Sequence, residues 1–363
     1  MKEQPISILN ALGWSAAWVN AFLALSNANH IPARVIREHR GVYALLSETG
    51  ECLAEVSGRF RHQARTRQDF PAVGDWVASE RPDELSRAII HAVLPRYSAF
   101  ARRTPGAKGE EQVVAANVDT VFLVSGLDHD FNPRRIERYL TLAYESGADP
   151  IVVLNKADLR TDPEEARLQA DAVAYGVPVL LVSAMTGFGL EALRNSLKPG
   201  TTGALLGSSG VGKSTIVNAL LGYDQLKTAA VSEFESRGRH TTTHRELIPL
   251  PGGAVLIDTP GMRELQLLAG DAALSRSFDE IAELAQSCRF HDCSHAGEPG
   301  CAVQAALTDG GLEMERYESY LRQLKEIRHH QVEQDVHLQI AENKRWKEIH
   351  RSMRHHHKRK NGG

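Results

Sequence analysis

The sequence has no long hydrophobic run and little net charge, and each absence excludes a class of protein. No stretch approaches the roughly 20 uncharged apolar residues of a membrane span. The first residues, MKEQPISILNALGW, carry both charge signs and no apolar core, so we expect no signal peptide. A formal net charge of −3 gives the chain no general attraction to a polyanion. These features predict a cytoplasmic protein with no membrane partner.

Cysteine is scarce, but three of the four cysteines are clustered. Cys288, Cys293 and Cys301 fall within fourteen residues, in the stretch CRFHDCSHAGEPGC. In a reducing compartment this clustering indicates a metal rather than disulfides. With His295 the spacing is C-x4-C-x-H-x5-C, and three thiolates with one imidazole make the closed tetrahedral shell of one structural Zn²⁺. His291 is a rival nitrogen ligand that needs a different loop path.

The length of 363 residues allows two or three domains. Residues 1–32 carry Trp14, Trp18, Phe22 and Leu25 at helical spacing. This spacing predicts an N-terminal helical extension, a short amphipathic helix that packs on a neighbouring domain.

Residues 33–103 consist of short β-type runs separated by Gly, Asp and Pro, which predicts a small β-barrel of four or five strands. The stretch from Arg102 to Gln112 is charged and rich in Pro and Gly, and we expect a linker there. Arginine is abundant in the barrel segment, where it serves either contact with RNA or the solubility of strand edges. These arginines include Arg34, Arg37, Arg40, Arg59, Arg61, Arg65 and Arg67.

Residues 112–270 alternate fully apolar strands with helices, which predicts an α/β domain with a parallel sheet covered on both faces. Residues 271–340 become helical and polar around the cysteines, so we expect a mainly helical domain that binds zinc. Residues 341–363 form a basic tail. Its run KRWKEIHRSMRHHHKRK has one acidic residue, Glu348, and is more typical of a solvated tail than of a binding element.

The segment GSSGVGKST, residues 207–215, matches the phosphate-loop pattern G-x-x-x-x-G-K-[ST] in full. It lies between an apolar strand and the helical run TIVNALLG. Its glycines let the backbone fold around an anion, and the following helix presents its positive end to the phosphates. Lys213 reaches the β- and γ-phosphates, and the Ser214 hydroxyl coordinates Mg²⁺. The loop therefore predicts a nucleoside triphosphate without naming its base.

The sequence NKAD, residues 155–158, predicts that the base is guanine. It follows the apolar strand IVVL, and a carboxylate at Asp158 accepts hydrogen bonds from N1–H and the exocyclic amine of guanine. Adenine lacks this donor pair, so a buried carboxylate rejects it. Lys156 lies along the ring, and Asn155 ties the loop to neighbouring segments. The stretch SAMTG supports this reading, because the backbone N–H of Ala184 suits the guanine O6.

The switch and metal elements follow the phosphate loop. In DTPG, Asp258 holds the Mg²⁺ shell and the Gly261 N–H senses the γ-phosphate. Thr242 is the expected second hydroxyl ligand of Mg²⁺, with Thr241 as the near alternative. The predicted GTP-binding residues are Asn155, Lys156, Ala157, Asp158, Ser183, Ala184, Gly207, Ser208, Ser209, Gly210, Val211, Gly212, Lys213, Ser214, Thr215, Asp258 and Gly261.

These motifs occur in rotated order, because the base-reading segments precede the phosphate loop. An ordinary GTPase begins with the phosphate loop, so the order predicts circular permutation, which is tolerated where the original ends lie close together at the surface. Met262 replaces the water-orienting glutamine of many GTPases, so we expect slow intrinsic turnover. His240 is the predicted catalytic residue, with His244 or a group from a partner as alternatives.

With these residues in place, the sequence resembles the RsgA (YjeQ) family, the bacterial GTPases that depend on the small ribosomal subunit. The similarity spans about residues 33–335 and includes AVGDWV, NKAD, GSSGVGKST, GRHTTT, DTPGMRE and CRFHDCSHAGEPGCAV. The resemblance implies an OB-fold barrel, a permuted GTPase core and a C-terminal zinc domain. It also implies late maturation of the 30S subunit, with GTPase activity stimulated by that particle. The family's zinc ligands match Cys288, Cys293, His295 and Cys301, and its proposed catalytic histidine matches His240.

We therefore expect a monomeric GTPase whose partners are GTP, GDP, the 30S subunit and its 16S rRNA. Two alternatives stay open: a permuted GTPase acting on another ribosomal particle, and a nucleotide-gated RNA-binding module. Asp158 and the absence of an acceptor-site motif argue against an ATPase or a small-molecule kinase.

Overall fold

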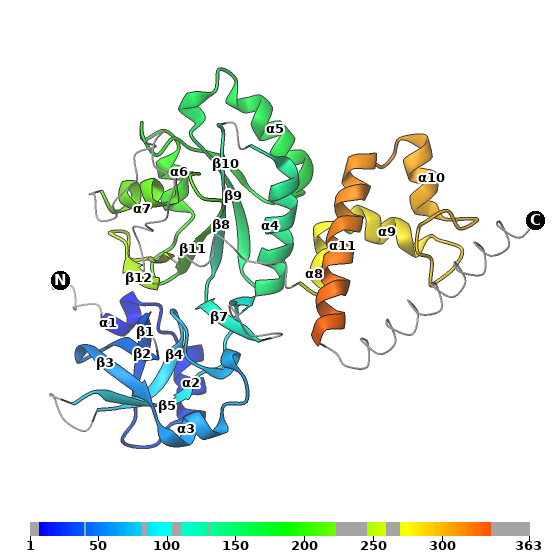
Figure 1. The fold of residues 1–363 in the computed structure, drawn as a ribbon. Coiled ribbons are helices and arrows are strands. Elements are labelled where there is room, and N and C mark those ends of the chain that lie inside the picture. Colours follow the sequence, from blue (N-terminus) through cyan, green and yellow to red (C-terminus); the bar gives the residue numbers. More distant parts are fainter. Residues whose placement is uncertain are drawn as a thin grey trace, which may run out of the picture. The chain divides into compact units, whose positions relative to one another are not determined.

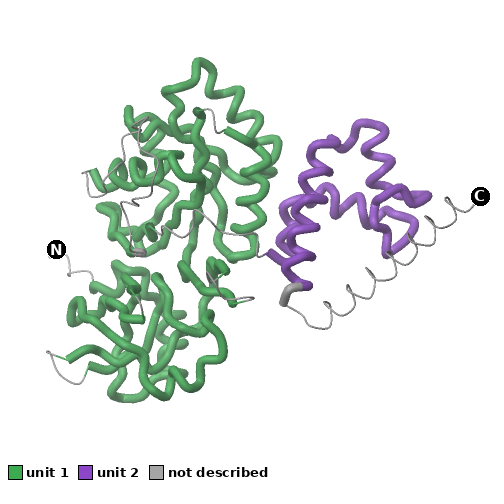
Figure 2. The backbone as a smooth tube through the Cα atoms, in the orientation of Figure 1, with its two compact units in different colours: residues 1–266 green, residues 267–363 purple. Residues whose placement is uncertain are grey.

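The computed structural model describes residues 7–39, 41–81, 86–103, 110–128, 131–222, 245–258 and 269–334. The backbone forms two compact units, residues 1–266 and residues 267–363 (Figure 2). The predicted basic tail, residues 341–363, lies outside the described residues. Within the described part of the chain, no helix is long and apolar enough to cross a membrane.

Unit 1 begins with a five-stranded barrel made of β1 (Ile31–His39), β2 (Val42–Ser47), β3 (Gly50–Val56), β4 (Trp76–Glu80) and β5 (Ala88–Val93) (Figure 1). The strands pair in the order β1-β2-β3-β5-β4, and β4 pairs back with β1 to close the barrel. Its interior holds apolar side chains such as Val35, Leu45 and Ile90, which are fully buried. The closed five-stranded arrangement confirms the predicted barrel of the OB type.

Most of the predicted linker, residues 104–109, lies outside the described residues, and a pair of strands flanks it. Strand β6 (Ala99–Arg103) pairs with β7 (Glu111–Ala116) in a separate antiparallel sheet. The barrel therefore closes at Val93, ten residues before the predicted boundary at 103. The Pro and Gly residues between these strands predicted the linker, and the short runs on either side of it form the two strands.

The N-terminal extension contains two helices rather than the one predicted, α1 (Ile8–Ala11) and α2 (Ala16–Leu25). Gly13 separates them with a φ of +92°, and a Cβ at this position would lie 2.4 Å from the carbonyl oxygen of Gly200. Trp14 then packs edge-on against Trp76 of the barrel, with ring centres 4.8 Å apart. The close approach at Gly13 thus breaks the helix and lets the extension dock.

The second part of unit 1 is a sheet of β8 (Thr120–Gly126), β9 (Asp149–Asn155), β10 (Val179–Leu181), β11 (Thr202–Leu206), β12 (Arg245–Pro249) and β13 (Val255–Asp258). The order is β10-β9-β8-β11-β13-β12, and all neighbours are parallel except β12 and β13. The helices of this part are α4 (Pro133–Ser146), α5 (Pro163–Ala174), α6 (Leu190–Asn195) and α7 (Lys213–Leu221). Figure 1 shows α4 and α5 on one face of the sheet and α6 and α7 on the other. This arrangement confirms the predicted α/β domain.

Strand β12 joins the sheet of the α/β domain to the barrel. It pairs in antiparallel fashion with β1, where Arg37 stands opposite Glu246. The sheet therefore continues without a break from β10 through β12 into the barrel. This pairing also covers an edge strand that would otherwise expose its backbone polar groups.

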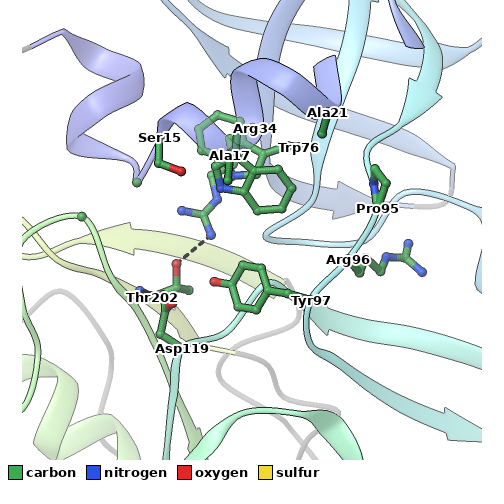
Figure 3. A pocket seen from close by; sticks show the side chains of 13 residues that line it. Ser15, Ala17, Ala21, Arg34, Trp76, Pro95, Arg96, Tyr97, Asp119 and Thr202 are labelled. Atoms are coloured by element: carbon green, nitrogen blue, oxygen red, sulfur yellow. Dashed lines mark hydrogen bonds between the residues drawn. The ribbon is translucent and has the colours of Figure 1, made fainter. Parts of the chain in front are cut away.

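Arg34 of β1 forms a second link between the barrel and the α/β domain (Figure 3). Its side chain is buried, and its Nη2 donates a hydrogen bond of 2.7 Å to Oγ1 of Thr202. Nε donates to the carbonyl oxygen of Gly74 at 3.2 Å, and Nη1 donates to that of Leu12. The guanidinium lies 5.1 Å from the centre of the Trp76 ring. Burial lowers the pKa of Arg34 to about 10, which leaves it charged at neutral pH.

Unit 2 is mainly helical over its described residues and contains α8 (Asp271–Ser277), α9 (Asp279–Gln286), α10 (Ala302–Asp309) and α11 (Met314–Gln334). Phe278, between α8 and α9, is fully buried and packs edge-on against Tyr320, with ring centres 5.6 Å apart. Arg316 lies 4.2 Å above the Phe278 ring and donates from Nε to Oε1 of Glu280 at 2.6 Å. These contacts give the unit its own core, which confirms the mainly helical C-terminal domain.

We expect replacement of Arg34 by alanine to lower the free energy of unfolding of unit 1 by about 3–5 kcal/mol, because it leaves buried carbonyl groups without donors. Denaturant unfolding followed by tryptophan fluorescence measures this change, since Trp76 lies beside Arg34 and Trp14 packs on Trp76. Arg61→Ala, at an exposed position of the barrel, is the control that should leave the midpoint unchanged. A loss below 1 kcal/mol would show that Arg34 does not hold the two parts together.

Candidate functional site

The phosphate loop lies where β11 meets α7. Strand β11 ends at Leu206 and α7 begins at Lys213, so the loop spans the carboxyl end of a central parallel strand, the usual edge for ligand binding in such sheets. Nζ of Lys213 donates to the carbonyl oxygens of Gly207 and Ser208, both at 2.6 Å. The loop thus wraps around its own lysine, with the helix terminus directly behind it.

Two glycines of the loop are required by close contacts. A Cβ at Gly207 would lie 2.3 Å from the carbonyl oxygen of Val124 on β8. Gly212 has a φ of +93°, and a Cβ there would lie 2.3 Å from Nδ2 of Asn155. The loop therefore packs directly on the strand and loop that precede it in the chain, where any larger residue would push it away.

The side-chain amide of Asn155 links three segments that are distant in the sequence. Its Nδ2 donates to the carbonyl oxygen of Val211 in the phosphate loop at 2.8 Å. Its Oδ1 accepts from the backbone N–H of Ala184 at 3.1 Å. Asn155 is buried, and its bond to Val211 is buried with it, whereas the bond from Ala184 is partly buried. The structure thus brings the NKAD segment, the SAMTG segment and the phosphate loop together, as the predicted tie requires.

The remaining base-reading residues show two differences from the expectation. Asp158 is exposed, so a bound base would itself have to shield the carboxylate before adenine is rejected. The N–H of Ala184, expected to meet the guanine O6, is engaged by Asn155. Lys156 adopts a left-handed backbone, with φ of 64°, and its Nζ pairs with Oδ2 of Asp128. Ala157 and Ser183 are buried.

The predicted magnesium and switch residues are only partly described. Asp258 ends β13 at the same edge of the sheet as the phosphate loop, and it is 9% exposed. Ser214 and Thr215 form the first turn of α7. His240, Thr242 and Gly261 lie outside the described residues, as do Thr241, His244 and Met262.

Two residues beside the phosphate loop were not predicted from the sequence. Arg135 donates from Nη1 to Oγ of Ser208 at 3.1 Å, and the Tyr139 hydroxyl lies 3.2 Å from the same oxygen. Both residues belong to α4, one turn apart, so they share a face of that helix. Their spacing in PRRIERYL indicates a helix, but it does not indicate that this helix lies beside the phosphate loop.

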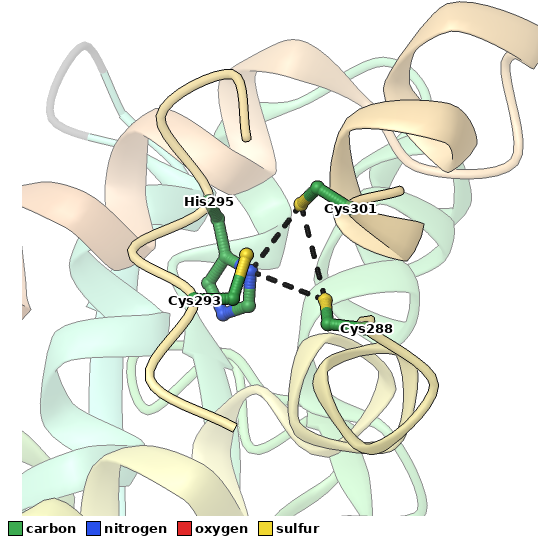
Figure 4. A group of neighbouring side chains, drawn as sticks. All are labelled: Cys288, Cys293, His295 and Cys301. Atoms are coloured by element: carbon green, nitrogen blue, oxygen red, sulfur yellow. Dashed lines mark hydrogen bonds between the residues drawn. The ribbon is translucent and has the colours of Figure 1, made fainter. Parts of the chain in front are cut away.

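The four predicted zinc ligands lie together in unit 2 (Figure 4). Sγ of Cys288 is 3.9 Å from Sγ of Cys301 and 3.6 Å from Nδ1 of His295, and the Cys301 sulfur is 3.5 Å from that nitrogen. With Cys293, all four ligand atoms lie within 4.8 Å of one another. A tetrahedral shell with bonds of about 2.3 Å to sulfur and 2.0 Å to nitrogen has sulfur–sulfur edges of about 3.8 Å and sulfur–nitrogen edges of about 3.5 Å. The cluster therefore fits a zinc ion, and His291 is not part of it.

Glu298 holds the loop that carries two of these ligands. Its carboxylate accepts from the backbone N–H groups of Ser294 at 3.0 Å and Ala296 at 2.8 Å. Hydrogen bonding, above all from the Ser294 hydroxyl, lowers the pKa of Glu298 to about 2. The carbonyl oxygen of His295 accepts from the Tyr317 hydroxyl at 2.8 Å, which fixes the left-handed backbone of that ligand. This support was not predicted from the sequence either.

Comparison with known proteins agrees with this architecture. The family model described as RsgA GTPase matches residues 93–268, and the model described as 50S ribosome-binding GTPase matches residues 202–361. A relative from Opitutus terrae, named small ribosomal subunit biogenesis GTPase RsgA, is 50% identical over 355 residues and covers 95% of this chain and 97% of its own length. A relative of the same name from Syntrophotalea carbinolica is 45% identical, covering 94% of this chain and 95% of its own. The chain belongs to the RsgA family.

Solved structures of similar proteins agree with the assignment to RsgA. YjeQ from Thermotoga maritima superposes with a TM-score of 0.61 at 29% identity, covering 82% of this chain and 98% of its own. YloQ, described as a circularly permuted GTPase, superposes with a TM-score of 0.59 at 26% identity, covering 83% and 96%. RsgA GTPases hydrolyse GTP, so the chain is a GTP phosphohydrolase with a permuted core. Hydrolysis of this kind uses Mg²⁺ bound with the nucleotide, and Ser214 and Asp258 offer the hard oxygen donors it prefers.

We expect the purified chain to carry one zinc ion, measured by elemental analysis. Its removal by a chelator should lower the melting temperature of unit 2 by more than about 10 °C, because metal binding contributes directly to folding. GDP affinity should stay constant, since the phosphate loop belongs to unit 1. Cys52→Ser, the cysteine outside the cluster, is the control that should keep the zinc. A zinc-free chain that melts at the same temperature as the untreated protein would exclude a structural metal.

Proposed function

We propose that the chain binds the small ribosomal subunit and assists its late maturation, hydrolysing GTP with stimulation by that particle. The observation that carries this proposal is the match over 97% of the Opitutus relative named for small-subunit biogenesis. A match of this extent takes in the barrel, the permuted core and the cysteine cluster together. On this basis the chain would act as a monomer in the cytoplasm, with 16S rRNA as part of its binding surface.

We propose a role for the site residues at each part of the nucleotide. Asp158 would accept from N1–H and the amine of guanine, while Lys156 would leave Asp128 to lie along the ring. Lys213 would exchange the carbonyls of Gly207 and Ser208 for phosphate oxygens, because a charged acceptor binds an ammonium more strongly than a neutral one.

Ser214 and Thr242 would supply hydroxyl ligands to Mg²⁺, with Asp258 holding its water shell. The Gly261 N–H would contact the γ-phosphate. We assign His240 to the attacking water, because Met262 cannot orient water by hydrogen bonding. Because methionine stands where many GTPases have glutamine, we also expect slow GTP turnover by the chain alone.

The cysteine cluster would hold one zinc ion with no open coordination position. Three thiolates and an imidazole fill the shell, so the metal would stabilise the fold of unit 2 rather than take part in the reaction. The edge lengths within the cluster support this assignment.

A second candidate, action on the large subunit, has one observation in its favour: the model described as 50S ribosome-binding GTPase matches residues 202–361. That match starts at β11 and omits the barrel and the base-reading strands. We prefer the small subunit because the matches to the RsgA relatives include both the barrel and the base-reading strands.

The two candidates differ in which particle stimulates hydrolysis. We expect 30S subunits to raise the rate of GTP turnover at least tenfold, while 50S subunits and 70S ribosomes raise it far less. Phosphate release measured against increasing concentrations of each particle checks this. Stimulation by 50S subunits alone would favour the second candidate, and no stimulation by any particle would contradict both. His240→Ala should abolish the stimulated rate without changing GDP affinity.

A further inference from the structure

Among the described residues in the barrel and just after it, two groups of arginines can be distinguished. In the first group the guanidinium is engaged by other parts of the protein. Arg34 is buried between the barrel and the α/β domain. Arg37 pairs with Glu51, and Arg96 donates to the buried Asp75 at 2.7 Å. These side chains have structural roles and are poorly placed to bind another molecule.

The second group comprises four arginines that lie within nine residues, on α3 (Gly58–Gln63) and the turn that follows: Arg59, Arg61, Arg65 and Arg67. All four are exposed. In the part of the chain that the structure describes, none of them makes an ion pair or a side-chain hydrogen bond. Folding therefore leaves four fixed positive charges unused on one short segment, which we name the α3 patch.

The backbone beneath the α3 patch is firmly held. Oγ of Ser57 accepts from the N–H of Phe60 at 3.0 Å and so caps the helix. Phe60 packs edge-on against Phe70, with ring centres 5.9 Å apart, and both join the barrel core. Because Phe60 faces the core, Arg59 and Arg61 emerge on either side of it. The charges are thus presented by a rigid base, which reduces the entropy lost on binding.

The acidic residue of this segment does not neutralise the patch. Asp69 accepts the backbone N–H groups of Arg65 at 2.7 Å and Thr66 at 2.8 Å. These hydrogen bonds, led by the one from Thr66, lower the pKa of Asp69, so its carboxylate serves the turn. Between residues 57 and 70 the chain carries four arginines and one acidic residue, in a protein whose overall charge is −3.

We propose that the α3 patch binds the phosphate backbone of RNA. A guanidinium has a planar array of donors that matches two phosphate oxygens, and several of them in a row suit a repeating anion. The segment presents no exposed aromatic or aliphatic anchor, since Phe60 and Phe70 are packed inward, and such anchors carry the binding energy of most protein interfaces. A nucleic-acid backbone fits these features better than a protein partner. The proposal rests on the proposed ribosomal function and names a contact surface for it.

The test compares two double variants of the full chain that lose the same charge. R61Q/R65Q removes two arginines of the α3 patch. R87Q/R167Q removes the exposed Arg87 and the half-buried Arg167, which are paired with acidic residues, Arg87 with Glu55 and Arg167 with Glu164. Affinity for a 16S rRNA transcript and for purified 30S subunits is measured at several salt concentrations. Unchanged melting and unchanged basal GTP turnover confirm that each variant is folded.

We expect R61Q/R65Q to make the slope of log K against log salt shallower by about two on both RNA and 30S, and to weaken binding about tenfold or more at 0.1 M salt. R87Q/R167Q should keep the wild-type slope. Equal slopes for R61Q/R65Q and the wild type on the transcript would overturn the proposal. So would weaker binding to 30S without any change on the bare transcript, because that result identifies a ribosomal protein as the partner.

The ribosomal function can fail separately from the α3 patch. If the wild-type chain does not bind 30S subunits, the proposed function is wrong. In that case, a shallower salt dependence of R61Q/R65Q binding to the transcript would still support the α3 patch as an RNA-binding surface.

Discussion

The side-chain amide of Asn155 is the contact on which the nucleotide site depends. It joins the phosphate loop to both base-reading segments with one donor and one acceptor, 2.8 Å and 3.1 Å from their partners. The loops it joins are 56 and 29 residues away along the chain, so no local preference could hold them in register. Because the amide is buried, breaking either bond would leave a backbone group without a partner. The requirement for glycine at position 212 follows from the same contact.

The rotated order of the motifs changes which parts of the chain adjoin the nucleotide site, not the site itself. The strand of the phosphate loop, β11, still lies between β8 and β13, with the base-reading strands β9 and β10 beyond β8. The barrel precedes the α/β domain in sequence, yet its strand β1 pairs with β12, which follows the phosphate loop. The chain therefore passes the nucleotide edge and returns to the barrel. Any shift of β12 would act on the barrel directly through backbone hydrogen bonds.

The larger features of the fold follow from local patterns in the sequence. Apolar strands that alternate with helices determine the α/β domain, and the motif GSSGVGKST determines where its phosphate loop lies. Short β runs indicated the barrel, and the spacing of Cys288, Cys293, His295 and Cys301 indicated a cluster that the structure brings together. In each case the pattern lies within a short stretch of the chain, so the amino-acid sequence alone is enough to predict the feature.

The features that could not be predicted depend on contacts between distant residues. The helix break at Gly13 results from the close approach of Gly200, and the sequence around Gly13 gives no sign of this contact. Arg34 looked like any other barrel arginine until the structure placed it against Thr202. Arg135 and Tyr139 sit on an ordinary amphipathic helix, and only the fold brings them to the phosphate loop. The exposure of Asp158 likewise depends on what surrounds the loop, which its sequence does not contain.

The most direct test of this account is the GDP affinity of the Asn155→Ala variant, measured by calorimetry on the full chain. We expect a loss of roughly tenfold to a hundredfold, because two backbone groups of the site lose their partner and the base-reading segments separate from the phosphate loop. Asn195→Ala, at an exposed position at the end of α6, should bind GDP like the wild type. Wild-type affinity in Asn155→Ala would show that the three loops hold their positions without this amide.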